Sequence, residues 1–269
     1  MADRPVLFDL ARFLRQREEL GAGSFAFESL SRDEIARLLR EGRARGRATE
    51  GSREEAGDTD LTRPVRKPSG PSEITAASDP VDLPSDHGPL RELALGCVRC
   101  PLSEGRTQVV FHDGSPDARL MVVGEAPGAN EDASGVPFVG AAGKYLDLLM
   151  ASVGLSRRES VYICNVIKCR PPGNRNPKPD EISACSPWLK RQIEVVKPEV
   201  ILAVGTFSAQ LLTGKDIALG RLRGEIYSYE GTPLVVTYHP AALLRNSRWT
   251  RPCWEDFQLL RRVMDGAPT

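Results

Sequence analysis

The sequence predicts a three-layer α/β/α sandwich with a central four-stranded parallel sheet, preceded by a helical and disordered N-terminal extension. Two observations support this. Four short apolar runs, rich in β-branched residues, recur between residues 120 and 238. Segments with helical periodicity alternate with them. Continuous apolar runs are typical of strands buried on both faces, and strands that alternate with helices favour a right-handed parallel α/β arrangement.

The expected strands are residues 120–124, 161–167, 200–205 and 234–238. The expected helices are residues 141–153, 179–196, 206–212 and 254–264. Pro187 lies inside the second of these helices. It is compatible with a kink in one helix or with the start of a new helix after Ser186.

The 269 residues include 36 Lys and Arg against 36 Asp and Glu, so the formal net charge is zero. This balance excludes a histone-like or tail-driven nucleic-acid binder. No apolar run approaches the ~20 residues that span a bilayer. The N-terminus places charges inside its apolar pattern, unlike a secretory signal. We therefore expect a soluble cytoplasmic protein that does not associate with membranes.

The zero net charge is the sum of two unlike parts. Residues 1–88 carry a net charge of −3 and residues 89–269 a net charge of +3. Within the first part, residues 1–45 show helical periodicity and predict a helical appendage, or else a docking segment for a partner protein. Residues 46–88 contain no aromatic Phe, Tyr or Trp and predict a disordered linker. The main domain is then residues 89–269.

Polar residues follow the expected strands where a parallel sheet binds its ligands, beyond the carboxyl ends. Gly124, Glu125 and Ala126 form the turn after the first strand, and Asn165 ends the second. Gly205 follows the third strand, and His239, one of three histidines, follows the fourth. We therefore expect a site that includes these residues.

Six cysteines form a second pattern. The spacing of Cys97 and Cys100 lets two thiolates reach one metal, although an incidental or redox-active pair is an alternative. Cys164 lies in a strand, where a buried free thiol is the usual role. Cys169 and Cys185 are too far apart to be the second close pair of a zinc ribbon. With the first two they favour an iron–sulfur cluster.

Four segments carry a resemblance to a known family: LGCVRCPLSEGRTQVVF, GEAPGANEDASGVPFVGAAGKYLD, YICNVIKCRPPGNRNPKPDEISAC and YHPAALLRN. In order and spacing, the chain resembles the family 4 uracil-DNA glycosylases, the iron–sulfur branch of that superfamily, over roughly residues 89–265. The resemblance implies a DNA repair enzyme that hydrolyses the N-glycosidic bond of deoxyuridine, releases uracil and leaves an abasic site. It also implies a [4Fe–4S] cluster on Cys97, Cys100, Cys169 and Cys185.

The chemistry assigns roles to the residues at the strand ends. A flipped uracil offers an acceptor at O4 and a donor at N3, which the carboxamide of Asn165 can match. Phe138 offers a face for stacking. The turn Gly124–Ala126 can face uracil O2, and His239 can donate to O2 as negative charge develops. Glu125 is the candidate for positioning water, with Glu131 and Asp132 as weaker candidates.

We expect single- or double-stranded uracil-containing DNA to contact the segment after His239. Pro240, Leu244 and Arg245 are the expected contacts, with Leu244 as the side chain that wedges into the base stack. Further phosphate contacts are expected from cations near the strand ends: Lys168, Arg170, Arg175, Arg248 and Arg251.

The alternatives are a non-catalytic DNA-binding relative and a relative that bonds covalently to uracil-containing DNA. The covalent branch carries a nucleophilic histidine in a basic loop after the second strand, and residues 168–179 contain no histidine. We expect a monomeric enzyme.

Overall fold

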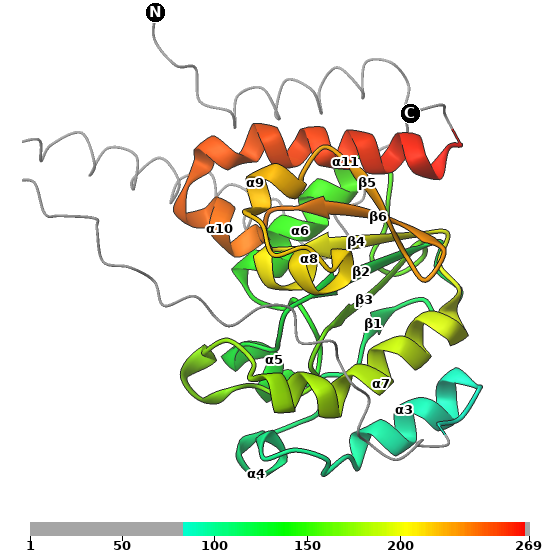
Figure 1. The fold of residues 1–269 in the computed structure, drawn as a ribbon, viewed down its shortest axis with the longest axis vertical. Helices are drawn as coiled ribbons and strands as arrows, with labels where there is room; N and C mark the ends of the chain where they lie inside the picture. Colours follow the sequence, from blue (N-terminus) through cyan, green and yellow to red (C-terminus); the bar gives the residue numbers. More distant parts are fainter. Residues whose placement is uncertain (1–82, 267–269) are drawn as a thin grey trace, which may run out of the picture. The chain divides into compact units, whose positions relative to one another are not determined.

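The computed structural model describes residues 83–266. Its centre is a six-stranded sheet with the order β1-β3-β2-β4-β6-β5 (Figure 1). The four inner strands are parallel, as predicted. The strands are β1 (Asp113–Gly114), β2 (Leu120–Gly124), β3 (Val161–Asn165), β4 (Val200–Val204), β5 (Ile226–Tyr229) and β6 (Thr232–Thr237). The predicted appendage, residues 1–45, and most of the predicted linker, residues 46–88, lie outside the described residues.

The two antiparallel edge strands were not predicted. β1 is only two residues long and pairs with β3, so it is too short to show a hydropathy pattern. β5 alternates exposed and half-buried residues and joins β6 in a hairpin. The hairpin turn is Glu230–Gly231, and both residues have positive φ. Glu-Gly is a weaker turn signal than Asn-Gly or Asp-Gly, so the sequence does not predict this hairpin.

Helices cover both faces of the sheet (Figure 1). Met121 and Val123 of β2 pack into a core with helices α3, α7 and α8, while Leu120 and Val122 pack into a second core with α6 and α11. This alternation is what a strand buried on both faces requires. The α-helices are α3 (His87–Leu95), α4 (Leu102–Gly105), α5 (Ala129–Ser134), α6 (Ala141–Ser152), α7 (Pro179–Val196), α8 (Thr206–Thr213), α9 (Leu219–Leu222), α10 (Pro240–Arg245) and α11 (Thr250–Met264); 3-10 turns are η1 (Pro172–Asn174) and η2 (Ser247–Trp249).

The helix α7 settles the ambiguity at Pro187, because a single helix runs through this residue. Pro187 has no N–H to donate. In the turn before it, the Ser186 hydroxyl donates to the Ile182 carbonyl at 2.6 Å. Three other predicted helices are also present. The last of them, α11, begins at Thr250, four residues earlier than expected.

The folded part begins before residue 89. Leu83 is buried, and a hydrogen bond of 3.1 Å joins His87 Nε2 to the Tyr162 hydroxyl of β3. The predicted boundary between linker and domain therefore falls inside α3. Within residues 83–266, no helix combines the length and the apolar character that crossing a membrane requires.

Candidate active site and cysteine pocket

The adjacent ends of β2 and β3 form the floor of the candidate site. Gly124 and Asn165 are register partners at the last position of each strand. A Cβ placed on Gly124 would lie 2.3 Å from Asn165 Oδ1 and 2.7 Å from the Phe138 ring. Gly124 is therefore a residue whose missing side chain leaves room for two predicted base-contacting groups.

Phe138 joins this floor to His239. Their ring centroids are 5.5 Å apart and the rings are inclined by 26°, a stacked arrangement. On the other side, Gly205 has a φ of +97°, and a Cβ there would lie 3.1 Å from the His239 Cβ. The structure thus brings together Gly124, Phe138, Asn165 and His239, which come from four separate segments of the chain.

Asn165 is 2% exposed. Within the described residues, its carboxamide forms no hydrogen bond with another group. Neither amide atom is among the fully buried side-chain atoms that lack a partner, so water or a ligand can reach both. The Asn165 side chain is thus available for a donor–acceptor pair on a ligand.

Phe138 has a backbone conformation that depends on Arg157, a residue that the sequence analysis missed. Its φ of +54° is unusual for a residue with a side chain. Arg157 donates to the carbonyls of Phe138 at 3.0 Å and Pro137 at 3.2 Å. Asp147 and Asp113 hold the same guanidinium at 2.7 and 2.9 Å. No motif marks Arg157, because its partners are remote in sequence.

His239 is neutral at physiological pH. Its pKa is lowered to about 4, mainly by burial and also by the nearby Arg245, while Glu131 opposes the shift. The Ala241 N–H donates to His239 Nδ1 at 3.1 Å, so the lone pair lies on Nδ1 and the proton on Nε2. The imidazole is therefore oriented as a neutral donor through Nε2, the form that the predicted role requires.

The three candidate carboxylates differ in their surroundings. Glu125 is half-buried, and burial raises its pKa. Glu131 accepts hydrogen bonds from the backbone N–H groups of Gly128, Val139 and Gly140 at 3.1 to 3.3 Å. Asp132 is buried and accepts from the Thr107 N–H at 2.9 Å. Glu131 and Asp132 therefore hold the loops around Phe138, which leaves Glu125 as the carboxylate free of such bonds.

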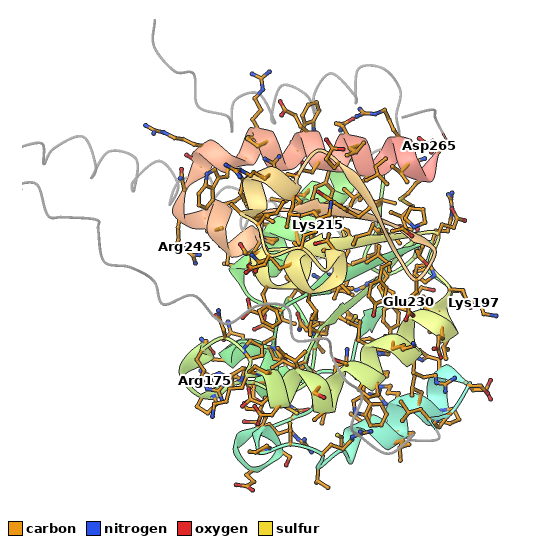
Figure 2. The ribbon with its side chains drawn as sticks, in the orientation of Figure 1. Arg175, Lys197, Lys215, Glu230, Arg245 and Asp265 are labelled. Carbon is orange, nitrogen blue, oxygen red and sulfur yellow. The ribbon has the colours of Figure 1, made fainter. Side chains whose placement is uncertain are left out.

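The helix α10 begins directly after His239 and carries the predicted DNA contacts. Pro240 is buried at its first position, whereas Leu244 is 47% exposed. Arg245 is exposed at the end of the helix (Figure 2). An exposed apolar side chain is suited to wedging into a base stack, and the neighbouring cation is suited to contacting phosphate. The contacts of these three residues with DNA stay predictions.

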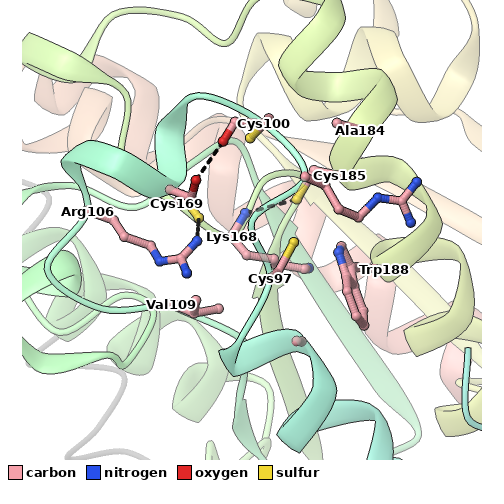
Figure 3. A pocket seen from close by; sticks show the side chains of 12 residues that line it. Cys97, Cys100, Arg106, Val109, Lys168, Cys169, Ala184, Cys185 and Trp188 are labelled. Carbon is pink, nitrogen blue, oxygen red and sulfur yellow. Dashed lines mark hydrogen bonds between the residues drawn. The ribbon is translucent and has the colours of Figure 1, made fainter. Parts of the chain in front are cut away.

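Four cysteines line one pocket (Figure 3): Cys97, Cys100, Cys169 and Cys185. All four are free thiols. The Arg106 guanidinium donates to Cys169 Sγ, and the Lys168 backbone N–H donates to Cys185 Sγ, both at 3.3 Å. Cys164 lies outside this pocket and is fully buried in β3, as predicted for a structural thiol. N–H groups aimed at sulfur are typical partners of metal-bound thiolates.

The pocket is positively charged. Its described lining includes the cations Arg99, Arg106 and Lys168 and contains no Asp or Glu. Two of its lining residues, Arg99 and Trp188, each have a buried N–H without a partner. Among the described residues, no three Cys, His, Asp or Glu side chains are grouped closely enough to hold a single metal ion. The pocket thus combines four thiols, three cations and two unpartnered N–H groups, a chemistry compatible with an anionic ligand.

Two of the expected phosphate contacts have other roles. Lys168 is 2% exposed, so the expectation that it contacts phosphate is wrong. Its Nζ donates to the Asn165 carbonyl at 2.6 Å instead. Arg175 forms a bidentate ion pair with the buried Glu181, at 2.5 and 2.8 Å. Arg248 and Arg251 are exposed, so their role stays a prediction.

Comparison with known proteins identifies the class of this fold and site. The family model of the uracil DNA glycosylase superfamily matches residues 111–258, a span that includes all four strand ends. A type-4 uracil-DNA glycosylase of Sulfurisphaera tokodaii is 42% identical over 182 residues, covering 65% of this chain and 83% of that protein. One of Thermotoga maritima is 47% identical over 152 residues, covering 56% and 79%. A type-5 enzyme of Pyrobaculum aerophilum is less similar, at 32% over 151 residues, covering 50% and 66%. The chain belongs to the type-4 uracil-DNA glycosylases.

Proposed function

We propose that this chain is a DNA repair glycosylase that hydrolyses the N-glycosidic bond of deoxyuridine in DNA. The products are free uracil and an abasic site. The observation that carries this proposal is the grouping of Gly124, Phe138, Asn165 and His239 at the carboxyl ends of the parallel strands. The membership of this chain in the type-4 family also supports it, since the matched span contains these four residues.

In the proposed reaction, water adds through its oxygen to C1′ while the C1′–N1 bond breaks. The bonding electron pair leaves on N1, and the uracil anion carries its charge partly on O2. A fixed donor at O2 stabilises this charge more in the transition state than in the ground state. His239 Nε2–H supplies that donor without a change in its protonation state. Protonation by solvent completes the uracil product.

Glu125 is the proposed base. It accepts a proton as the water attacks, and its negative charge stabilises the developing positive charge on the sugar. Its raised pKa makes it a stronger base than a solvated carboxylate. Phe138 stacks on the flipped base, and Asn165 pairs with the N3 and O4 edge. Cytosine reverses that donor–acceptor pattern and leaves the buried Asn165 groups unpaired.

We further propose that Cys97, Cys100, Cys169 and Cys185 hold a [4Fe–4S] cluster. The cluster, when bound, would cross-link three segments of the chain and supply negative charge, since hydrolysis requires no electron. Three cations without a carboxylate in the pocket lining support this assignment. The stabilising contacts to the thiolates are those of Arg106 and the Lys168 N–H.

The test of the activity uses purified protein and a labelled oligonucleotide with one uracil. We expect alkali-labile breaks at that position and none in a matched cytosine substrate. The absence of abasic product from U:G, U:A and single-stranded substrates would contradict the proposed function.

The test of the cluster compares two buried cysteines. Cys185→Ala is expected to lose bound iron and sulfide together with the visible absorbance of the protein. Cys164→Ala is the matched control, because Cys164 is also buried but lies outside the pocket. Equal iron content in the two variants would contradict the cluster assignment. A cytoplasmic location, a monomeric state and a protein partner for the predicted appendage, residues 1–45, stay predictions.

A further inference from the structure

Lys168 connects the cysteine pocket to the grouping of Gly124, Phe138, Asn165 and His239, which we call the base site. Its backbone N–H donates to Cys185 Sγ at 3.3 Å, and its side-chain Nζ donates to the Asn165 carbonyl at 2.6 Å. Lys168 itself lines the pocket (Figure 3). A single residue thus contacts one of the four cysteines and the residue proposed to read uracil.

The side chain of Lys168 is a buried charge with few partners. It is 2% exposed, and within the described residues no carboxylate forms an ion pair with it. A buried ammonium is costly unless opposite charge or several acceptors compensate for it. Four thiolates around a [4Fe–4S] core have a net negative charge and would provide that compensation from the pocket side.

The carbonyl that receives the Lys168 hydrogen bond lies at the point where β3 ends. The next two N–H groups, of Val166 and Ile167, donate to the carbonyls of Gly124 and Glu125 at 2.9 and 3.2 Å. These bonds join the end of β3 to the turn after β2. A charge-assisted hydrogen bond to the Asn165 carbonyl therefore fixes the peptide from which the Asn165 side chain projects.

We propose that Lys168 is a positioning residue that couples the cysteine pocket to Asn165, so that an occupied pocket holds the uracil-reading carboxamide in place. Lys168 does not contact the substrate and acts only through Asn165. This inference rests on the proposed function. It gives the proposed cluster a structural role in a hydrolase, which is to help hold Asn165 in place.

The test compares Lys168→Met with wild type at equal iron content. The variant removes the ammonium but keeps a long apolar stem. We expect kcat for uracil excision to fall about tenfold or more with little change in KM for DNA, because misplacement of a positioned group mainly affects the chemical step. Lys190→Met is the matched control, since Lys190 is an exposed lysine paired with Glu230, and it should retain wild-type kcat.

The dependence on Asn165 is tested with a double-mutant cycle. In an Asn165→Ala background, Lys168→Met should cause no further loss of kcat, because the two changes remove one function. Losses that multiply, or a Lys168→Met variant with wild-type kcat, would overturn the proposal. If Lys168→Met lacks iron, iron content and kcat are measured for Lys168→Arg instead. Retention of both the cluster and kcat in Lys168→Arg supports the coupling, and loss of the cluster in this variant overturns it.

A measurement without substrate separates this proposal from the proposed function. Hydrogen exchange of the Val166 and Ile167 amides should be faster in Lys168→Met than in wild type at equal iron content. Unchanged exchange would overturn the coupling. A wild-type protein that releases no uracil would instead overturn the proposed function, whatever the exchange rates are.

Discussion

The base site and the cysteine pocket of this molecule are built in opposite ways. The base site is held by the chain itself: Gly124 and Gly205 provide space, Glu131 and Arg157 fix the surrounding loops, and His239 is neutral. The cysteine pocket combines four thiols with three cations, and its described lining contains no carboxylate. Contacts within the chain therefore position the first site, whereas for the second we propose a bound anionic group that balances its charge.

The largest expected effect concerns the space at Gly124. A Gly124→Ala substitution places a Cβ at 2.3 Å from Asn165 Oδ1, so the carboxamide must move. We expect excision to fall by more than about 100-fold, because a displaced reading group misaligns the base. Gly105→Ala is the control, since a Cβ at Gly105 meets no atom within 4 Å. Single-turnover rates of the two variants measure the difference, and similar rates would contradict the account of the base site.

The next effect concerns the donor at O2. Loss of one donor from a site of developing charge costs about 100-fold or more in kcat. His239→Ala should show a loss of this order, while Asn165→Ala should lose about tenfold or more by leaving the uracil edge unpaired. Thermal unfolding of each variant serves as the control for folding. A variant with wild-type turnover would remove its residue from the proposed mechanism.

A smaller effect is expected from a change at Arg157. This change tests whether contacts within the chain hold the base site. Arg157→Ala releases the Phe138 carbonyl and should lower kcat/KM about tenfold by disturbing the stacking face. Arg119 is the control because it is also an arginine paired with a carboxylate: it forms a bidentate pair with Glu199, but at the surface. Arg119→Ala should change stability by less than about 1 kcal/mol and leave excision unchanged. Equal activity of both variants would contradict the role of Arg157.

The smallest effect is on the pH dependence of stability. Burial lowers the pKa of both His239 and His112 to about 4, from an ordinary value of 6.5. Unfolding exposes these histidines, which then bind protons at a higher pH than in the folded state. The free energy of unfolding should therefore fall as the pH decreases from about 6.5 towards 4. Denaturant titrations across this range test the sign, and a His112→Gln variant should weaken the dependence.

The sequence predicts the parts of this fold that are dominated by burial. The four parallel strands are continuous apolar runs, so their predicted positions agree with the structure. Because ligands bind beyond the carboxyl ends of parallel strands, the sequence also places Asn165 and His239 correctly at these ends. The edge strand β5 was missed because its residues are half exposed. Arg157 was missed and Lys168 was wrongly assigned to phosphate, because their roles depend on carbonyl groups that only the folded backbone brings within reach.

The most direct measurement of the central claim is a mass analysis of the products from a uracil-containing duplex under single-turnover conditions. We expect one equivalent of free uracil and one of abasic DNA, with no cytosine released from the matched substrate. A protein–DNA adduct that survives denaturation would instead indicate covalent capture. DNA that is bound but returned intact would indicate a binding protein, and either result would contradict the account.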